Sequence, residues 1–218
     1  MANQEWSELH SGAQVGKFIG FWLTLLKALA RPFIWLRLTP NQISIIAVII
    51  SIPLILDFKY WWLILIGLLM DGIDGQVALA TGRASKSGAV IDSISDRTVE
   101  FIWAVGMYLS GLNFALVFTF IGLAWIQAYL RARAGGLGYR KIGLITIGER
   151  PTRGVFAIFI SIFSRFGHSI IWIAVAVQAL SLLSLIRVFE KEINREAIQQ
   201  DSGYAAPAKN DDDSDLPF

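Results

Sequence analysis

The chain has 218 residues, of which 55% are hydrophobic, and its net charge is only +2. Soluble domains are about 45–50% apolar, so this composition, with a mean hydropathy of +0.55, predicts an integral membrane protein. The small net charge gives no reason to expect nucleic acid as a partner. The sequence contains no cysteine, which excludes disulfides and thiolate metal sites.

The first predicted element is residues 17–37, where apolar residues are interspersed with Lys17, Lys27, Arg31 and Arg37. This pattern is typical of a helix that lies in the membrane interface, with its basic residues at the lipid headgroups. The alternative is a solvent-facing amphipathic helix that packs on the rest of the protein. The residues before it lack the basic start and apolar core of a cleavable signal peptide.

Six apolar stretches follow, and several approach the roughly 20 residues needed to cross a bilayer. Turn-forming residues separate them, and Thr39 or Asn41 is placed to cap the first. The predicted spans are residues 42–56, 60–80, 88–109, 113–133, 154–164 and 168–188. The expected fold class is therefore an all-α integral membrane protein, with about six transmembrane helices preceded by an amphipathic interfacial helix.

Composition also divides the chain. We predict an N-terminal segment (1–40) with the interfacial helix, a six-helix membrane domain (41–190), and a polar, disordered C-terminal tail (191–218) that buries too little apolar surface to order itself. Lys and Arg gather in the loops on one side of the predicted membrane, as in cytoplasmic loops. We therefore expect a multi-pass protein of the cell membrane with both termini and the aspartates described next on the cytoplasmic side.

The second and third predicted spans meet at DGIDGQVALATGRASKSGAVIDSISD, residues 71–96, which carries four aspartates. Asp71 and Asp74 are three residues apart and Asp92 and Asp96 are four apart, so each pair shares a helix face. A short loop makes the two helices antiparallel neighbours, and both pairs then converge at one membrane depth. Ionisable groups within membrane spans are costly and usually functional.

Four converging carboxylates need positive charge nearby, and Arg97 alone is too little. An all-oxygen site suits hard divalent cations, and two ions bridged by shared aspartates suit phosphoryl transfer. Gly75 and Gly88 leave room on the facing helices for a ligand or a backbone. The structural alternative, a helix N-cap at Asp92 with small-residue packing, accounts for two aspartates but not for four.

The same residues carry a resemblance to a known family. The stretch resembles D-x2-D-G-x2-A-R-x8-G-x3-D-x3-D, the signature of the CDP-alcohol phosphotransferases, also called CDP-alcohol phosphatidyltransferases. The positions that match are Asp71, Asp74, Gly75, Ala78, Gly88, Asp92 and Asp96. The one that does not is Leu79, where the family has arginine.

This resemblance implies an activity and a set of roles. Members of the family displace CMP from a CDP-linked lipid or alcohol with the hydroxyl of a second alcohol, and they are membrane-embedded homodimers that need Mg²⁺ or Mn²⁺. It implies that Asp71, Asp74 and Asp92 hold the metal, expected as two ions, with Asp96 as a further ligand and the general base. The donor nucleotide contacts that it implies are Asn41, Gln42, Ile43, Ser44, Gly75 and Ser85.

Leu79 is the departure from the family pattern, because leucine cannot offer a nucleotide a hydrogen bond or a charge. Arg83, one helical turn later, is one candidate replacement. The other hypotheses are a different nucleotide pose, weakened nucleotide binding, and an engineered or natural inactive form.

The loop after the fourth span, YLRARAGGLGYRKIGLITIGERPTR, concerns the acceptor. It resembles the YIKARAE…ERPER pattern of the family's phosphatidylinositol phosphate synthases and their archaeal ether-lipid counterparts, which use inositol 1-phosphate. Here Arg131 replaces the lysine of YIKARAE and Gly135 replaces its glutamate. Guanidinium groups bind phosphate well, and the expected acceptor-phosphate residues are Arg131, Arg150, Arg153 and Arg187. The alternative for these arginines is positive-inside anchoring alone.

The sequence therefore predicts a metal-dependent, lipid-synthesising transferase. It would move a phosphatidyl group from CDP-diacylglycerol, or an ether-lipid analogue, to a phosphorylated polyol, with inositol 1-phosphate as the first choice. One alternative is glycerol 3-phosphate as acceptor, which makes a phosphatidylglycerophosphate synthase. Another is a catalytically impaired relative, motivated by Leu79. The third, a divalent-cation carrier or channel, is disfavoured because the aspartates cluster at one membrane edge instead of following a path across it.

Overall fold

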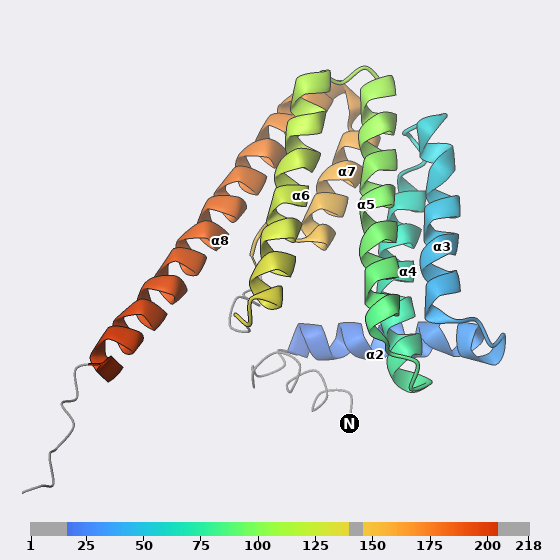
Figure 1. Ribbon diagram of the computed structural model, residues 1–218. Coiled ribbons are helices and arrows are strands. Elements are labelled where there is room, and N and C mark those ends of the chain that lie inside the picture. The colour runs from blue at the N-terminus through green and yellow to red at the C-terminus, as the bar shows by residue number, and fades with distance from the viewer. Residues whose placement is uncertain (1–16, 140–145, 205–218) are drawn as a thin grey trace, which may run out of the picture.

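The computed structural model describes residues 17–139 and 146–204, and all regular elements in these two ranges are helices. Helices α3 to α8 run up and down, and α2 lies across one end of them (Figure 1). In chain order the elements are α2 (Lys17–Trp35), α3 (Pro40–Ser51), the 3-10 helix η1 (Ile52–Ile55), α4 (Trp61–Ala80), α5 (Lys86–Leu109), α6 (Phe114–Gly136), α7 (Arg150–Ile162), the 3-10 helix η3 (Ser164–Phe166) and α8 (Gly167–Tyr204). The predicted all-α fold is confirmed.

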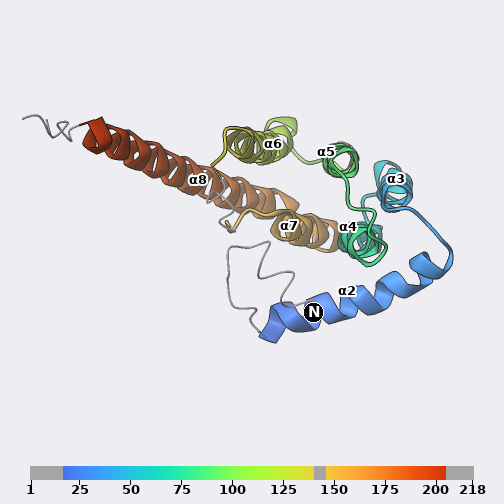
Figure 2. The same cartoon turned by 60° about the horizontal axis from the view of Figure 1, so that its bottom comes forward.

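Helix α2 is the element that was expected to lie in the membrane interface. Its segment Thr24–Trp35 meets Pro40–Ile55 at 102°, and Figure 2 shows it passing beside the end of α4. Leu26 of α2 is buried against α4, and a Cβ at Gly72 of α4 would lie only 2.7 Å from Leu26 Cδ1. The missing side chain at Gly72 thus allows α2 to cross the bundle closely, at the near-right angle that suits an interfacial helix.

The start of α3 is defined by a capping box. The Gln42 backbone N–H donates to Thr39 Oγ1 at 3.3 Å, and the Thr39 N–H donates to Gln42 Oε1 at 2.8 Å. Pro40 occupies the start of the helix, where its missing N–H costs nothing. Of the two caps that the sequence allowed, the structure uses Thr39.

The largest apolar core lies at the end of the bundle away from α2, where the α3–α4 and α5–α6 connections meet (Figure 1). Trp103 and Met107 of α5 are fully buried there with Phe120 of α6. A Cβ at Gly106 would lie 2.5 Å from the Leu54 carbonyl oxygen, so α5 can pack against η1 only with glycine at this position. This packing holds α5, and with it two of the motif aspartates, against α3 and α4.

A count of six membrane spans is not confirmed, although each predicted span coincides with a helix. Among the described residues, only Trp61–Ala80, Phe114–Gly136 and Ser164–Arg195 are long and apolar enough to cross a membrane, with a fourth span if the bent pair α2–α3 acts as one. Helix α7 has 13 residues, short of the roughly 20 that a bilayer requires. Helix α5 is long enough, but its aspartates, Arg97 and Glu100 make it more polar than a simple span.

The predicted C-terminal tail needs a correction. Helix α8 continues to Tyr204, past the predicted span end at 188, so the segment 191–218 begins within a helix and not as a disordered tail. The sequence EKEINREA is rich in strong helix formers, and Arg195 pairs with Glu192 one turn earlier at 3.6 Å. The tail after Tyr204 lies outside the described residues.

Candidate active site

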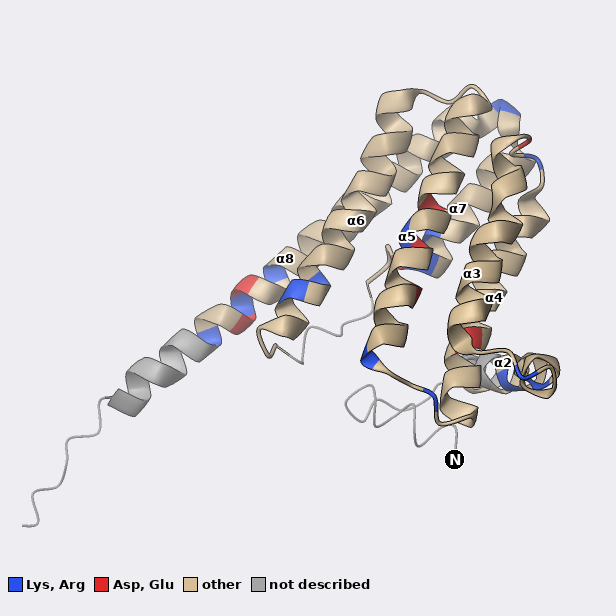
Figure 3. Ribbon diagram, turned by 45° about the vertical axis from the view of Figure 1, so that its right-hand side comes forward, with Lys and Arg blue, Asp and Glu red and all other residues tan. Residues whose placement is uncertain are grey.

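The four motif aspartates lie on α4 and α5, in the halves of these helices nearer α2 (Figure 3). Carboxylate oxygens of Asp71, Asp74 and Asp92 all lie within 4.8 Å of one another. Asp96 is linked to this group through Arg150, which forms ion pairs with both Asp71 and Asp96. The structure therefore brings both aspartate pairs to one place, as the spacing indicated.

The three clustered carboxylates could hold a metal ion. Their donor atoms are all oxygens, the ligand type that hard divalent cations prefer. Asp74 is 6% exposed, and its Oδ2 accepts a 2.6 Å hydrogen bond from Ser44 Oγ, which orients the carboxylate. Asp96, predicted as a fourth metal ligand, is not part of this three-carboxylate group and instead contacts Arg150.

A cavity of 170 Å³ adjoins the aspartates. Two of them, Asp74 and Asp92, form part of its wall. A Cβ at Gly75 would meet no atom within 4 Å, so this glycine leaves the wall open. The other lining residues are Pro40, Asn41, Ser44, Ala78, Arg83, Ala84, Ser85, Gly88 and Ala89.

Most of the expected nucleotide contacts, Asn41, Ser44, Gly75 and Ser85, line this cavity, but Gln42 and Ile43 do not. The Gln42 side chain is used in the capping box of α3. Ile43 is fully buried in the core that α3 forms with α2 and α4. The sequence could not separate Gln42 and Ile43 from Asn41 and Ser44, because all four belong to the first turns of α3.

Leu79, at the position of the family arginine, is 49% exposed and does not line the cavity. Helix α4 ends at Ala80, and Gly82 adopts a left-handed φ of 65° in the turn that follows. The Arg83 N–H closes that turn on the Ala78 carbonyl at 2.9 Å. The turn thus carries Arg83 back to the cavity wall, where it is the one basic residue among the lining residues within 17–139 and 146–204.

The four arginines expected at an acceptor phosphate occupy different surroundings. Arg150 is buried and contacts the aspartates directly. Arg131 on α6 pairs with Glu149, and Arg153 on α7 is buried against Glu100. Arg187 is exposed on α8 and takes part in none of these pairs. Of these four arginines, Arg150 is the one that contacts the motif carboxylates. Arg97 of α5 also pairs with Asp96, at 3.7 Å.

Glu100 is a site residue that the sequence reasoning missed. It is completely buried, and its Oε1 accepts hydrogen bonds from Arg153 Nε at 2.9 Å and Arg153 Nη2 at 2.6 Å. Its Oε2 accepts a third from Trp125 Nε1 at 3.1 Å. A signal was present in the sequence, because Glu100 lies four residues after Asp96 and so on the same face of α5.

Glu149, at the N-cap of α7, is the second such residue. Burial raises the pKa of this carboxyl, but hydrogen bonds from the Arg131 and Thr146 side chains and from the Thr146 backbone outweigh burial and bring the pKa below its ordinary value. Glu149 is therefore ionised when it pairs with Arg131. The position just before a helix also suits a negative charge.

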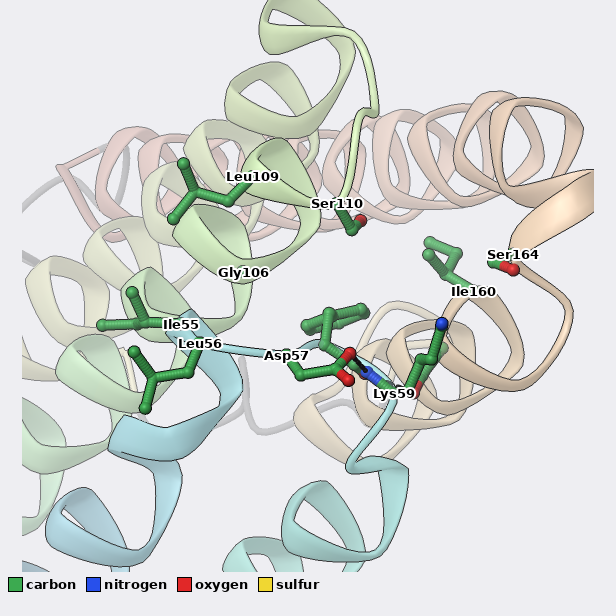
Figure 4. Close-up of a pocket in the computed structure, with 11 residues that line it drawn as sticks. Ile55, Leu56, Asp57, Lys59, Gly106, Leu109, Ser110, Ile160 and Ser164 are labelled. Atoms are coloured by element: carbon green, nitrogen blue, oxygen red, sulfur yellow. Dashed lines mark hydrogen bonds between the residues drawn. The ribbon is translucent and has the colours of Figure 1, made fainter.

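A second cavity, of 330 Å³, lies at the opposite end of the bundle (Figure 4). Its charged lining residues are Asp57 and Lys59 of the α3–α4 connection, and Ser110, Ser161 and Ser164 add hydroxyl groups. One carboxylate next to one amine does not provide the gathered oxygen ligands found around Asp74. The cavity beside the aspartates is therefore the better candidate for the active site.

The chain also matches known proteins. Residues 21–180 match the family model described as CDP-alcohol phosphatidyltransferase. The chain belongs to this family. The family transfers groups from a CDP-alcohol donor to an alcohol acceptor in a membrane, so the chain is a membrane transferase by family and by its apolar helices.

Several curated family members resemble the chain. It is 36% identical over 104 residues to an archaetidylinositol phosphate synthase of Aeropyrum pernix, a match that covers 47% of the chain and 54% of that protein. It is 33% identical over 177 residues to an archaetidylinositol phosphate synthase of Pyrococcus horikoshii, covering 76% and 88%. It is 27% identical over 180 residues to a phosphatidylinositol phosphate synthase of Cutibacterium acnes, covering 75% and 87%.

Proposed function

We propose that the protein transfers a phosphatidyl group, or its ether-lipid equivalent, from a CDP-linked lipid to inositol 1-phosphate and releases CMP. The observation that carries this proposal is the gathering of Asp71, Asp74 and Asp92 beside a cavity lined by Asn41 and Ser85. The names of the relatives, archaetidylinositol phosphate synthase and phosphatidylinositol phosphate synthase, support the acceptor. Glycerol 3-phosphate, which also carries a phosphate, is the alternative acceptor.

In this proposal Asp71, Asp74 and Asp92 hold Mg²⁺ or Mn²⁺, as two ions with Asp96 as a further ligand. Metal bound there would neutralise charge on the diphosphate of the donor. Asp96 takes the proton of the acceptor hydroxyl. The hydroxyl oxygen then bonds to the phosphorus that bears the lipid, and the bond from that phosphorus to CMP breaks, so that CMP leaves with the electron pair.

The donor nucleotide occupies the cavity beside the aspartates. Asn41, Ser44, Gly75 and Ser85 contact it from the cavity wall, whereas Gln42 and Ile43 offer only backbone groups. We assign the cationic contact that Leu79 cannot make to Arg83, because Arg83 lines the cavity and a guanidinium pairs well with phosphate oxygens.

The acceptor phosphate binds on the side of the α7 arginines. Arg150 is its first contact, because it already lies against Asp71 and Asp96. Arg187 adds positive potential that attracts a phosphorylated acceptor. Arg131 and Arg153, whose charges are balanced by Glu149 and Glu100, are further proposed contacts of the acceptor phosphate. We further propose that the protein works as a homodimer, with the active site and both termini on the cytoplasmic side, which the basic loops support.

The test is CMP release by the purified full chain in detergent with Mg²⁺. CDP-diacylglycerol and its ether-lipid analogue serve as donors, and inositol 1-phosphate, glycerol 3-phosphate, free inositol and serine are offered separately. We expect release only with a phosphorylated acceptor and a loss of about 10²- to 10⁴-fold in Asp96→Asn, which lacks the base.

Asp57→Asn is the matched control, because Asp57 lies at the other end of the bundle and asparagine can still accept the 2.9 Å hydrogen bond from the Lys59 N–H. It should keep the parental rate. Release with free inositol or serine would contradict the assigned acceptor class. No release with any donor and acceptor would contradict the transferase itself.

A further inference from the structure

The residues 146–149, called here the α7 turn, lead directly into α7 and are tied to the helices on either side. The turn carries Thr146, Gly148 and Glu149, each with hydrogen bonds to distant parts of the chain. The contacts show what this anchoring positions.

Thr146 is the centre of the network. Its hydroxyl oxygen accepts hydrogen bonds from Gln127 Nε2 at 2.8 Å and from Arg131 Nη2 at 2.9 Å, both on α6. The hydroxyl also donates to Glu149 Oε1 at 2.7 Å. A hydroxyl has one proton and two lone pairs, so the bonding capacity of Thr146 is fully used.

A buried amide pair extends this network to α8. Gln178 Nε2 donates to Gln127 Oε1 at 2.7 Å, and the two residues are 1% and 2% exposed. Since the Gln127 carbonyl accepts from Gln178, its NH₂ group is directed at Thr146. Each of these amides thus has a direction imposed by its neighbour, and the line runs from α8 through α6 to the α7 turn.

Gly148 brings the turn into direct contact with α8. Its N–H donates to Ser181 Oγ at 3.0 Å. A Cβ at Gly148 would lie 2.7 Å from Ser181 Oγ and 2.8 Å from Gln178 Oε1, so only glycine fits without displacement. Its carbonyl accepts from Arg153 Nη1 at 2.6 Å, which fastens the first turn of α7 to the same point.

Arg150, the residue after the turn, is the one that contacts Asp71 and Asp96. Its backbone position follows that of Glu149, which Arg131 and Thr146 hold. We propose that Thr146, Gln127 and Gln178 are positioning residues, which hold the α7 turn so that Arg150 faces the motif aspartates and the acceptor. This role rests on the proposed function, since it assigns Arg150 to the acceptor side of the reaction.

A purely structural role for the network makes a different prediction. It would lower the stability of the protein but leave the rate constants of the folded molecules unchanged. A positioning role instead lowers kcat/KM for the acceptor and leaves the KM for the donor unchanged. The cavity beside Asp74 and Asp92, called here the donor cavity because the proposed function places the donor nucleotide in it, is lined by residues of α3, α4, α5 and the α4–α5 connection. Its lining residues include no member of the network. Loss of the network should therefore affect the acceptor and leave donor binding as it was.

The experiment compares Thr146→Val with Thr146→Ser in the full-length protein. Valine keeps the shape of threonine and removes the hydroxyl, whereas serine keeps the hydroxyl. We expect Thr146→Val to lower kcat/KM for inositol 1-phosphate by up to about 100-fold, because small misplacements have effects of that size, with the donor KM unchanged. Thr146→Ser should stay within about threefold of the parent, as a conservative rescue. Gln178→Leu should behave like Thr146→Val.

The matched control is Thr24→Val on α2, whose hydroxyl donates to the Gly20 carbonyl of its own helix at 2.8 Å. It should have parental kinetics. Parental kinetics in Thr146→Val and Gln178→Leu would overturn the positioning role while leaving the transferase intact. An equal loss in Thr146→Val and Thr146→Ser would overturn it as well.

Hydrogen exchange measures the same role without any turnover. In Thr146→Val the amides of residues 146–156 should exchange faster than in the parent, while those of 40–55, beside the donor cavity, stay unchanged. If the parent released no CMP under any condition, the proposed function would fail. The exchange result would still show whether the network holds the α7 turn in place. Unchanged exchange in 146–156 would overturn the inference.

Discussion

The donor cavity and the α7 turn adjoin different members of the aspartate group and are built differently. Asp74 and Asp92 line the cavity, whereas Asp71 and Asp96 contact Arg150, the residue after the turn. The cavity is lined by residues from one continuous part of the chain, 40–92; it is open at Gly75 and carries Arg83 on its wall. The α7 turn is held by residues far apart in the sequence, such as Arg153 with Glu100, 53 positions away, and Gln178 with Gln127, 51 positions away.

This difference separates the tasks of the two regions. The donor cavity offers unfilled space and a basic residue on its wall, as a site for a large, negatively charged ligand requires. The α7 turn offers side chains that are already paired, so the neighbouring arginines, Arg131, Arg150 and Arg153, have defined positions before a ligand arrives. Pre-organised charges of this kind do not need to reorient during a reaction.

The largest expected effect concerns the buried pair on the α7 side. Glu100→Leu leaves the Arg153 guanidinium buried without its carboxylate and should lower the free energy of unfolding by about 3–5 kcal/mol. The double variant Glu100→Leu/Arg153→Leu should recover part of that loss, because the buried guanidinium is gone and Arg97, which pairs with Glu100 at 3.6 Å, keeps Asp96 as a partner. Denaturation of the purified protein in detergent measures both. Exposed Glu190 supplies the control, since Glu190→Gln should change stability by less than about 0.5 kcal/mol. A double variant less stable than Glu100→Leu would contradict the ion-pair account.

The second prediction concerns the donor cavity. Arg83→Gln should raise the KM for the CDP-linked lipid by about 10- to 100-fold, the range of a lost hydrogen bond to a charged group. Acceptor KM should stay unchanged. Leu79→Arg in the same chain should restore donor binding, because it returns a guanidinium to the neighbouring turn. Lys86→Gln, a nearby charge that does not line the cavity, is the control. An unchanged donor KM in Arg83→Gln would remove Arg83 from the site.

Two glycines provide the third comparison. A Cβ at Gly75 would meet no atom within 4 Å, and alanine favours a helix more than glycine does. Gly75→Ala should therefore raise the free energy of unfolding by up to about 1 kcal/mol. The same methyl group narrows the donor cavity and should raise the donor KM. Gly148→Ala should instead lower the free energy of unfolding by about 1–3 kcal/mol through overpacking against Ser181. Thermal unfolding together with donor titrations separates the two. Equal changes in the free energy of unfolding in Gly75→Ala and Gly148→Ala would contradict the expected difference between the two glycines.

The smallest expected effect is a pH dependence on the α7 side. Because the pKa of Glu149 in the folded protein lies below its ordinary value of 4.5, its ionised form stabilises the fold above that value. The contribution is lost as the pH falls through the folded-state pKa. The stability difference between the parent and Glu149→Gln should therefore be constant between pH 5 and 8, within the flat region of such a titration, and shrink in more acidic solution. A difference that grew on acidification would have the wrong sign.

Much of this molecule could be predicted before its structure was described. Each of the six predicted spans coincides with a helix, and the aspartates that share helix faces do converge. The structure adds what depends on context. Gln42 serves a helix cap and Ile43 the core, although both stand beside residues that line the cavity. The tail was expected to be disordered, yet its first part continues α8, because local helix propensity is sufficient there.

The sequence by itself determined the membrane character, the helices and the shared faces of the aspartates, because hydrophobicity and the 3.6-residue period act over short distances along the chain. Only the tertiary structure decided that Arg83 and not Leu79 lines the cavity, that Glu100 and Glu149 hold Arg153 and Arg131, and that Gln127 and Gln178 support the α7 turn. Those pairings join residues on different helices. They depend on how the helices pack against one another, which no local pattern in the sequence specifies.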